Sequence, residues 1–242
     1  MMENNYISIG KAAKMIGVTT TTLRRWDQSG RFRAIRTPSG RRMYAIEQIE
    51  GFLRTPIFSQ AFNWIGSATP QEPPEREYCQ ASSVFQLRVM KLEQEFAKIE
   101  DLAKVASLIV AAVGEIGNNS FDHNIGNWPD VPGIFFGYDL KKRQIVLADR
   151  GQGILRTLKR VRPRLENDEQ ALEVAFTEVL SGRAPEERGN GLKFVRKIVP
   201  LAGIELFFQT GSASVKLTKE RNEVVVSHSE KSFRGCLVLI KF

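Results

Sequence analysis

Three short polar motifs, set in order along a largely apolar stretch of this 242-residue chain, constrain its fold most strongly. The first, Glu115-Ile-Gly-Asn-Asn119, places a carboxylate and an amide four residues apart, on one face of a helix. The second, Asp149-Arg-Gly-Gln-Gly153, directly follows the apolar run 145–148, and the third is the Arg-Gly-Asn-Gly-Leu of 188–192. An Asp-x-Gly-x-Gly occurs by chance about once in several thousand positions, so the ordered set indicates a ligand site.

In this order and spacing, the motifs resemble the N, G1 and G2 boxes of the GHKL ATPase superfamily, which includes gyrase B, Hsp90, MutL and histidine kinases. The resemblance implies a domain that binds ATP or ADP, with Asn119 coordinating Mg²⁺ and Asp149 accepting a hydrogen bond from the adenine amino group. It gives Glu115 the role of the carboxylate that activates water in a slow Mg²⁺-dependent ATPase. The other nucleotide contacts that it implies are Gly151, Gly153, Ile154, Arg188, Gly189, Gly191 and Leu192, with the last glycines at a helix N-terminus that favours phosphate.

The first 58 residues carry ten Lys and Arg against four acidic residues, so they hold most of the formal charge of +8. Such an excess indicates a polyanionic partner. Apolar residues at helical spacing on both sides of Gly17 predict a helix-turn-helix, with Thr19 capping the second helix. Trp26 on that helix is interpreted as a core aromatic rather than a DNA contact. Pro38 and Gly40 predict a turn between two short basic strands.

The segments SIGKAAKMIGV, TTTTLRRWDQSG and RTPSGRRMY resemble the winged helix-turn-helix of the MerR superfamily, especially its excisionase and resolvase members. The likeness covers Tyr6 to about Leu53. It implies that the second helix enters the major groove of double-stranded DNA while the wing holds the phosphate backbone. The contacts that it implies are Thr20, Thr21, Arg24 and Arg25 on the helix, and Arg41 and Arg42 on the wing.

The predicted organisation is a MerR-like DNA-binding domain at 1–58, a linker at 59–83 and a GHKL-type ATP-binding domain at 84–242. Three prolines and few apolar residues in 66–83 suggest that the linker is partly extended. The predicted fold class is α+β, a winged helix-turn-helix followed by a sandwich of helices on a mostly antiparallel sheet. The spacing of Val89, Leu92, Phe96 and Ile99 would suit a coiled-coil seam, but packing on the sheet is the preferred interpretation.

The sequence shows neither a signal peptide nor an apolar run long enough to cross a bilayer, so we expect a cytoplasmic protein without membrane contact. The predicted function is that of an ATP-binding, DNA-binding transcriptional regulator, acting as a homodimer, whose operator binding depends on its nucleotide state. Two alternatives remain open. One is a protein serine kinase resembling the anti-sigma group, which would act on a partner protein. The other is an accessory DNA-binding factor of a mobile element.

Overall fold

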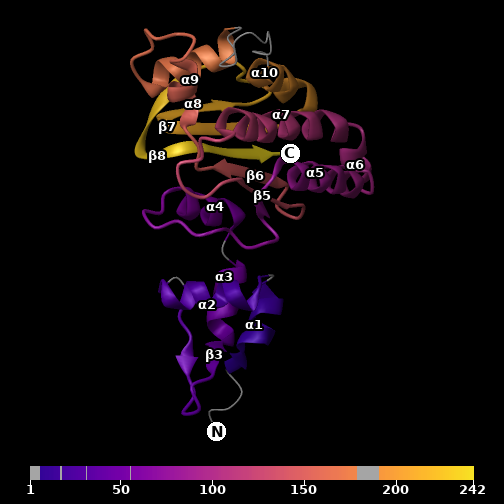
Figure 1. Ribbon diagram of the computed structural model, residues 1–242. Coiled ribbons are helices and arrows are strands. Elements are labelled where there is room, and N and C mark those ends of the chain that lie inside the picture. Colours follow the sequence, from indigo (N-terminus) through magenta and orange to yellow (C-terminus); the bar gives the residue numbers. More distant parts are fainter. Residues whose placement is uncertain (1–5, 17, 31, 55, 179–190) are drawn as a thin grey trace.

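The computed structural model describes residues 6–16, 18–30, 32–54, 56–178 and 191–242. Figure 1 shows a small N-terminal body and a larger body in which helices cover a sheet. The small body contains β1 (Tyr6–Ser8), α1 (Ile9–Ile16), α2 (Thr20–Gln28), β2 (Ile35–Arg36), β3 (Arg42–Ala45) and α3 (Ile46–Arg54). The larger body contains α4 (Ile57–Ile65), β4 (Tyr78–Cys79), α5 (Ser82–Phe96), α6 (Glu100–Ala103), α7 (Ala106–Asn124), β5 (Ile134–Asp139), β6 (Gln144–Asp149), α8 (Gly153–Leu158), α9 (Asp168–Thr177), α10 (Gly191–Ala202), β7 (Glu205–Leu217) and β8 (Val226–Lys241).

The N-terminal body is the expected helix-turn-helix with a wing. Thr19 caps α2, its Oγ1 accepting a hydrogen bond from the backbone N–H of Thr22 at 3.0 Å. Leu23 and Trp26 on α2 are fully buried in a small core with Tyr44, so Trp26 is the core aromatic that its spacing predicted. β3 lies in the middle of a three-stranded sheet, between β2 and β1, and β1 was not predicted.

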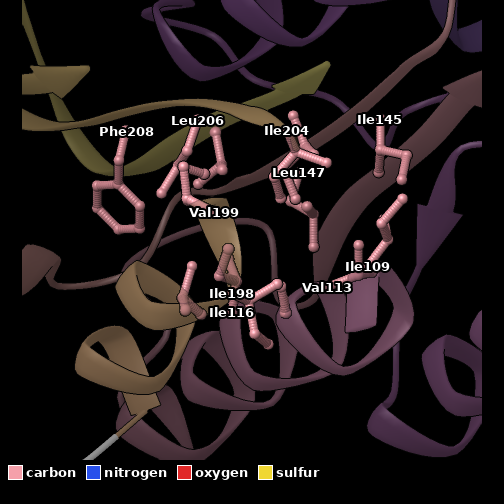
Figure 2. Packing of buried hydrophobic residues seen from close by; sticks show 14 of the residues in the cluster. Ile109, Val113, Ile116, Ile145, Leu147, Ile198, Val199, Ile204, Leu206 and Phe208 are labelled. Atoms are coloured by element: carbon pink, nitrogen blue, oxygen red, sulfur yellow. The ribbon is translucent and has the colours of Figure 1, made fainter. Parts of the chain in front are cut away.

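The larger body is built on a five-stranded sheet of order β4-β5-β6-β8-β7, in which each paired strand is antiparallel to its neighbour. Side chains alternate between the two faces of a strand. Ile145 and Leu147 of β6 therefore pack against α7 and α10, as Figure 2 shows, while Val146 and Ala148 point to the opposite face and pack against α4. Burial on both faces explains why the run 145–148 is apolar throughout.

The helix α5 packs into the core rather than forming a coiled-coil seam. Val89, Leu92 and Phe96 are buried in the main cluster, as the preferred interpretation of their spacing had it. Gly117 lets α7 approach α5 closely, because a Cβ at this position would lie 2.1 Å from Cζ of Phe85. This contact sets the position of the helix that carries the first motif.

The segment 59–83, which was predicted to be a linker, packs on the larger body, although 66–77 has the irregular backbone that was expected. Its first part belongs to α4, whose Ala61, Trp64 and Ile65 are buried against the second face of the sheet. Its last part includes β4, which pairs with β5. The prolines misled the prediction because an irregular segment can still be packed when its polar groups are satisfied, and here Nε1 of Trp64 donates to the carbonyl of Gln71 at 2.7 Å.

One buried guanidinium connects α4 to the sheet. Nη1 of Arg150, the residue after β6, donates to the carbonyl of Trp64 at 2.9 Å and also bonds the carbonyl of Ile65. Nη2 of Arg150 forms an ion pair with Asp130 at 3.0 Å. Only 8 % of the Arg150 side chain is exposed, so these partners compensate a charge that would otherwise be costly to bury.

Among the described strands, β7 and β8 are the longest, with 13 and 16 residues. The register of their pairing shifts around Gly211. β8 also pairs with β6 and so lies between β6 and β7. Within the described residues, no helix combines the length and the apolar character needed to cross a bilayer.

We expect Arg150→Ala to lower the free energy of unfolding of the larger body by about 3–5 kcal/mol, because it leaves buried carbonyls and the Asp130 carboxylate without their partner. Circular dichroism during denaturant unfolding would measure the loss. Arg234→Ala is the matched control, since Arg234 also contacts Asp130 but its side chain is 45 % exposed, and we expect a change below about 1 kcal/mol. Equal losses in both variants would contradict a special role for Arg150.

Candidate functional site: a cavity at the sheet end and a basic recognition helix

A cavity opens where α7, α8 and α10 meet the ends of β6 and β8. Its empty space, including the open mouth, measures about 860 Å³. Residues from all three sequence motifs line it. They are Asn119 from the first, Asp149, Gly153 and Ile154 from the second, and Gly191 and Leu192 from the third.

Asp149 forms the polar floor of this cavity. It is the last residue of β6, directly opposite Cys236 on β8, which in turn faces Thr210 on β7. One carboxylate oxygen of Asp149 accepts from Oγ of Ser120 and the other from the backbone N–H of Gly151, both at 2.8 Å. Burial raises the pKa of Asp149, while these hydrogen bonds and those from Cys236 favour its ionised form.

Two glycines allow the backbone to pass close to this carboxyl group. Gly153 has φ +75°, and the following Ile154 donates its N–H to Oγ1 of Thr210 at 3.2 Å. Gly235 has φ +90°, and a Cβ there would lie 2.0 Å from the carbonyl oxygen of Asp149. Both conformations are costly for residues with a side chain. The sheet end thus keeps an open space above Asp149.

Gly151 does not line the cavity, in contrast to the nucleotide contact that the resemblance implied. A Cβ on Gly151 would lie 2.1 Å from Nδ2 of Asn124, so this glycine makes room for a buried amide. Asn124 donates to the carbonyl of Ser120 at 2.7 Å and accepts from the N–H of Gln152 at 2.8 Å. Asn124 therefore joins the end of α7 to the loop after β6.

The first and third motifs meet at the N-terminus of α10. A Cβ on Gly191 would lie 2.9 Å from Nδ2 of Asn119 and 2.9 Å from Oε2 of Glu115. Glu115 is half-buried beside this junction and is absent from the cavity lining, whereas Asn119 belongs to it. Arg188 and Gly189 fall in 179–190, outside the described residues.

Three further polar residues at the site were not identified from the sequence: Ser120 and Asn124 line the cavity, and Thr210 contacts the lining residue Ile154. Ser120 holds Asp149, Asn124 holds the loop, and Thr210 supports Ile154 from a strand far along the chain. Ser120 and Asn124 adjoin the first motif, which is their only sequence signal. Among the described residues, no cluster of His, Cys, Asp and Glu is arranged to hold a metal ion by itself.

The predicted DNA-contacting residues occupy the surface of α2 and the wing. Thr21, Arg24, Arg25 and Arg41 are exposed, and Thr20 is half-buried. Arg42 differs from the phosphate contact that the resemblance implied, because its Nε donates to Oδ2 of Asp27 at 2.6 Å and only 19 % of its side chain is exposed. Arg42 thus joins the wing to α2.

Asp27 is the centre of that junction. Its Oδ1 accepts from the N–H of Ala34 at 2.9 Å, and its Oδ2 forms ion pairs with Arg42 and with Arg36, the latter at 3.3 Å. Burial opposes ionisation, but the Ala34 N–H and the two guanidinium groups outweigh it and lower the pKa of Asp27.

Comparison with protein families supports a DNA-binding role for this part of the chain. The family described as MerR family regulatory protein matches residues 8–44, which span α1, α2 and the wing. The N-terminal body is therefore a MerR-type helix-turn-helix domain, the kind found in DNA-binding transcription regulators. The match does not extend to the larger body. The chain has no match among curated proteins.

The lowered pKa of Asp27 predicts that acid loosens the N-terminal body. A carboxylate with a lowered folded-state pKa stabilises the fold above its unfolded pKa of about 3.9, and this contribution disappears as pH falls through the folded value. Asp27→Asn should lose about 1–3 kcal/mol near pH 7 and show a weaker loss on acidification below about pH 4. Hydrogen exchange of α2 and β3 in the full chain would measure it. Glu47→Gln, at an exposed site, should change neither quantity.

Proposed function

We propose that this protein is a DNA-binding transcriptional regulator whose larger domain binds ATP or ADP with Mg²⁺, and that nucleotide state changes its affinity for its operator. The observation that carries the proposal is that three motifs separated along the chain contribute Asn119, Asp149 and Gly191 to one cavity. Their order and spacing resemble a nucleotide-binding superfamily, and the cavity supplies the polar groups that such a ligand needs.

The adenine base would lie on the floor of the cavity. An ionised carboxylate offers about four acceptor positions, and Asp149 accepts from Ser120, from the N–H of Gly151 and from the N–H and thiol of Cys236 within the protein. The amino group of adenine would replace the thiol of Cys236, which is the weakest of these donors. Apolar walls from Ile154, Leu192 and Val238 suit a flat aromatic ring.

The phosphates would lie toward α10. Its N-terminal N–H groups favour negative charge, and Gly191 leaves no side chain between them and Asn119. An amide oxygen fits Mg²⁺, which prefers oxygen ligands and keeps several waters while bridging phosphates. The resemblance assigns Arg188 and Gly189, which lie outside the described residues, to phosphate binding as well. Glu115, beside Gly191, is the proposed general base for water if ATP is hydrolysed.

DNA binding would require two copies of the chain. A MerR-type domain carries a single recognition helix, and one short half-site gives little specificity, so dimers reading two half-sites are the usual solution. Residues of α5 in the core are not free to form the dimer, because Val89, Leu92 and Phe96 are buried. The outer face of the same helix exposes Leu87 and Met90, which makes it the proposed dimer contact. A dimer stabilised by nucleotide would couple the two domains.

The DNA-binding part of the proposal predicts that Arg24→Ala weakens binding to double-stranded DNA and reduces the slope of log affinity against log salt by about 0.9, the contribution of one phosphate contact. Fluorescence anisotropy across a salt series would measure both. Arg221→Ala, an exposed arginine far from α2, removes the same charge and should leave the slope unchanged. A loss of slope shared by both variants would contradict a specific contact by Arg24.

The nucleotide part predicts that the protein binds ATP or ADP in the presence of Mg²⁺ and that Asp149→Asn weakens this binding by about 1–3 kcal/mol, because the amino group loses a charged acceptor. Isothermal titration calorimetry would measure the affinity. Asp139→Asn, at the last residue of β5, is the control for loss of one carboxylate. Because Asp149 is buried, Asn119→Ala provides a second test that spares the floor of the cavity. Unchanged affinity in both site variants would contradict the assignment.

A further inference from the structure

We propose that Glu72 competes with DNA for Arg25 of the recognition helix, so that the larger domain restrains the DNA-binding surface through this single contact. The inference rests on the proposed role of α2 in DNA binding, and it assigns to the segment between α4 and β4 a regulatory role. It also identifies a physical connection between the cavity and the recognition helix.

The contact joins the two bodies directly. Nη2 of Arg25 lies 3.3 Å from Oε2 of Glu72, with each side chain a little under half exposed. Arg25 belongs to the predicted DNA-contacting set, whereas Glu72 belongs to the irregular segment that follows α4. Of the other exposed arginines in that set, neither Arg24 nor Arg41 has an ion pair to a described residue. Arg25 is therefore the member of the set that the larger domain neutralises.

Glu72 is held in place by its neighbours. The carbonyl of Gln71 accepts the hydrogen bond from Nε1 of Trp64, and Trp64 is 3 % exposed in the core below α4. Pro73 and Pro74 are buried, and the carbonyl of Pro74 accepts from the N–H of Glu77 at 2.9 Å. Fixing the backbone on both sides of Glu72 lowers the entropic cost of keeping its carboxylate at Arg25.

The same bonds continue to the floor of the cavity. Arg150 adjoins Asp149 in sequence and donates to the carbonyl of Trp64 at 2.9 Å. The connected groups thus run from Asp149 through Arg150 and Trp64 to the Gln71–Glu72 segment, and end at Arg25. A change at the cavity that moves Arg150 would move the backbone that positions Glu72. This chain of contacts couples the cavity to the recognition helix when a ligand in the cavity and DNA at Arg25 shift the same conformational equilibrium.

DNA and Glu72 cannot both occupy Arg25. A phosphate needs the same guanidinium, and a carboxylate next to the DNA backbone would repel it. An exposed ion pair of this type alters an equilibrium by about two- to five-fold. Removing the carboxylate should therefore tighten DNA binding by about that factor. The effect is opposite in sign to that of losing a DNA contact.

The decisive experiment is a double-mutant cycle on the full chain, with a fluorescent double-stranded DNA at fixed salt. Glu72→Gln should tighten binding about two- to five-fold. Glu75→Gln removes the same charge three residues away, at an exposed carboxylate with no ion pair to a described residue, and should change affinity less. In an Arg25→Ala background, Glu72→Gln should have no further effect.

Equal gains from Glu72→Gln and Glu75→Gln, or a gain from Glu72→Gln that persists without Arg25, would overturn the inference. Trp64→Phe keeps an aromatic side chain, although a smaller one, and removes the donor to Gln71, so it should shift affinity in the same direction as Glu72→Gln. If Arg24→Ala weakens DNA binding while the Glu72 cycle shows no coupling, the DNA-binding proposal stands and the inference fails. If neither Arg24→Ala nor Arg25→Ala weakens binding, α2 does not bind DNA and both fail.

Discussion

Burial of strand β6 on both faces is the constraint on which the rest of the larger domain depends. Ile145 and Leu147 require cover from α7 and α10, and Val146 and Ala148 require cover from α4. Because the strand ends in the carboxylate of Asp149 and is followed by the guanidinium of Arg150, these two charged residues are buried with it. Asp149 is satisfied on the side of α7 by Ser120, and Arg150 on the side of α4 by backbone carbonyls and Asp130. Two adjacent residues at the end of one strand thus contact two different layers.

This arrangement places the cavity at Asp149 on one side of the strand end and the contacts between Arg150 and α4 on the other side. The cavity above Asp149 remains open because Gly153, Gly191 and Gly235 bring backbone close without side chains. The joint below Arg150 remains closed because its side chain fills the space beneath α4. A ligand at the cavity and the position of α4 therefore depend on the same strand end. That dependence is the physical basis on which we propose that the two domains are coupled.

The arginines of the N-terminal domain differ in their ion pairs, which involve two acidic residues, Asp27 and Glu72. Asp27 holds Arg36 and Arg42 and thereby fixes the wing on α2. Glu72 holds Arg25 from the other domain, while Arg24 and Arg41 remain exposed to solvent. Charge alone indicated a surface for a polyanion. The pairing decides which arginines contribute to that surface and which maintain its shape.

Local pattern was sufficient for much of this protein. The helical spacing around Gly17, the Thr19 cap and the buried Trp26 are short-range features, and they predicted the helix-turn-helix correctly. The apolar run 145–148 lies in β6, and the predicted mixed α and β character is confirmed, because an apolar pattern reflects burial. The segment after α3 was misjudged, since its prolines indicate an irregular backbone but not whether that backbone packs. Whether this segment packs is decided by distant parts of the chain, namely Arg150 and the second face of the sheet.

In the polar sites too, some features were predicted from the sequence and others are decided by tertiary contacts. Motif spacing brought Asn119, Asp149 and Gly191 to attention, and the fold places them around one cavity. The roles of Ser120, Asn124 and Thr210 depend on contacts between segments 28 to 56 residues apart, for which a single sequence carries no signal. Gly151 and Arg42 matched their motifs by type, yet packing assigned them to a buried amide and to Asp27. A residue's chemistry is set by its type, but its partner is set by tertiary geometry.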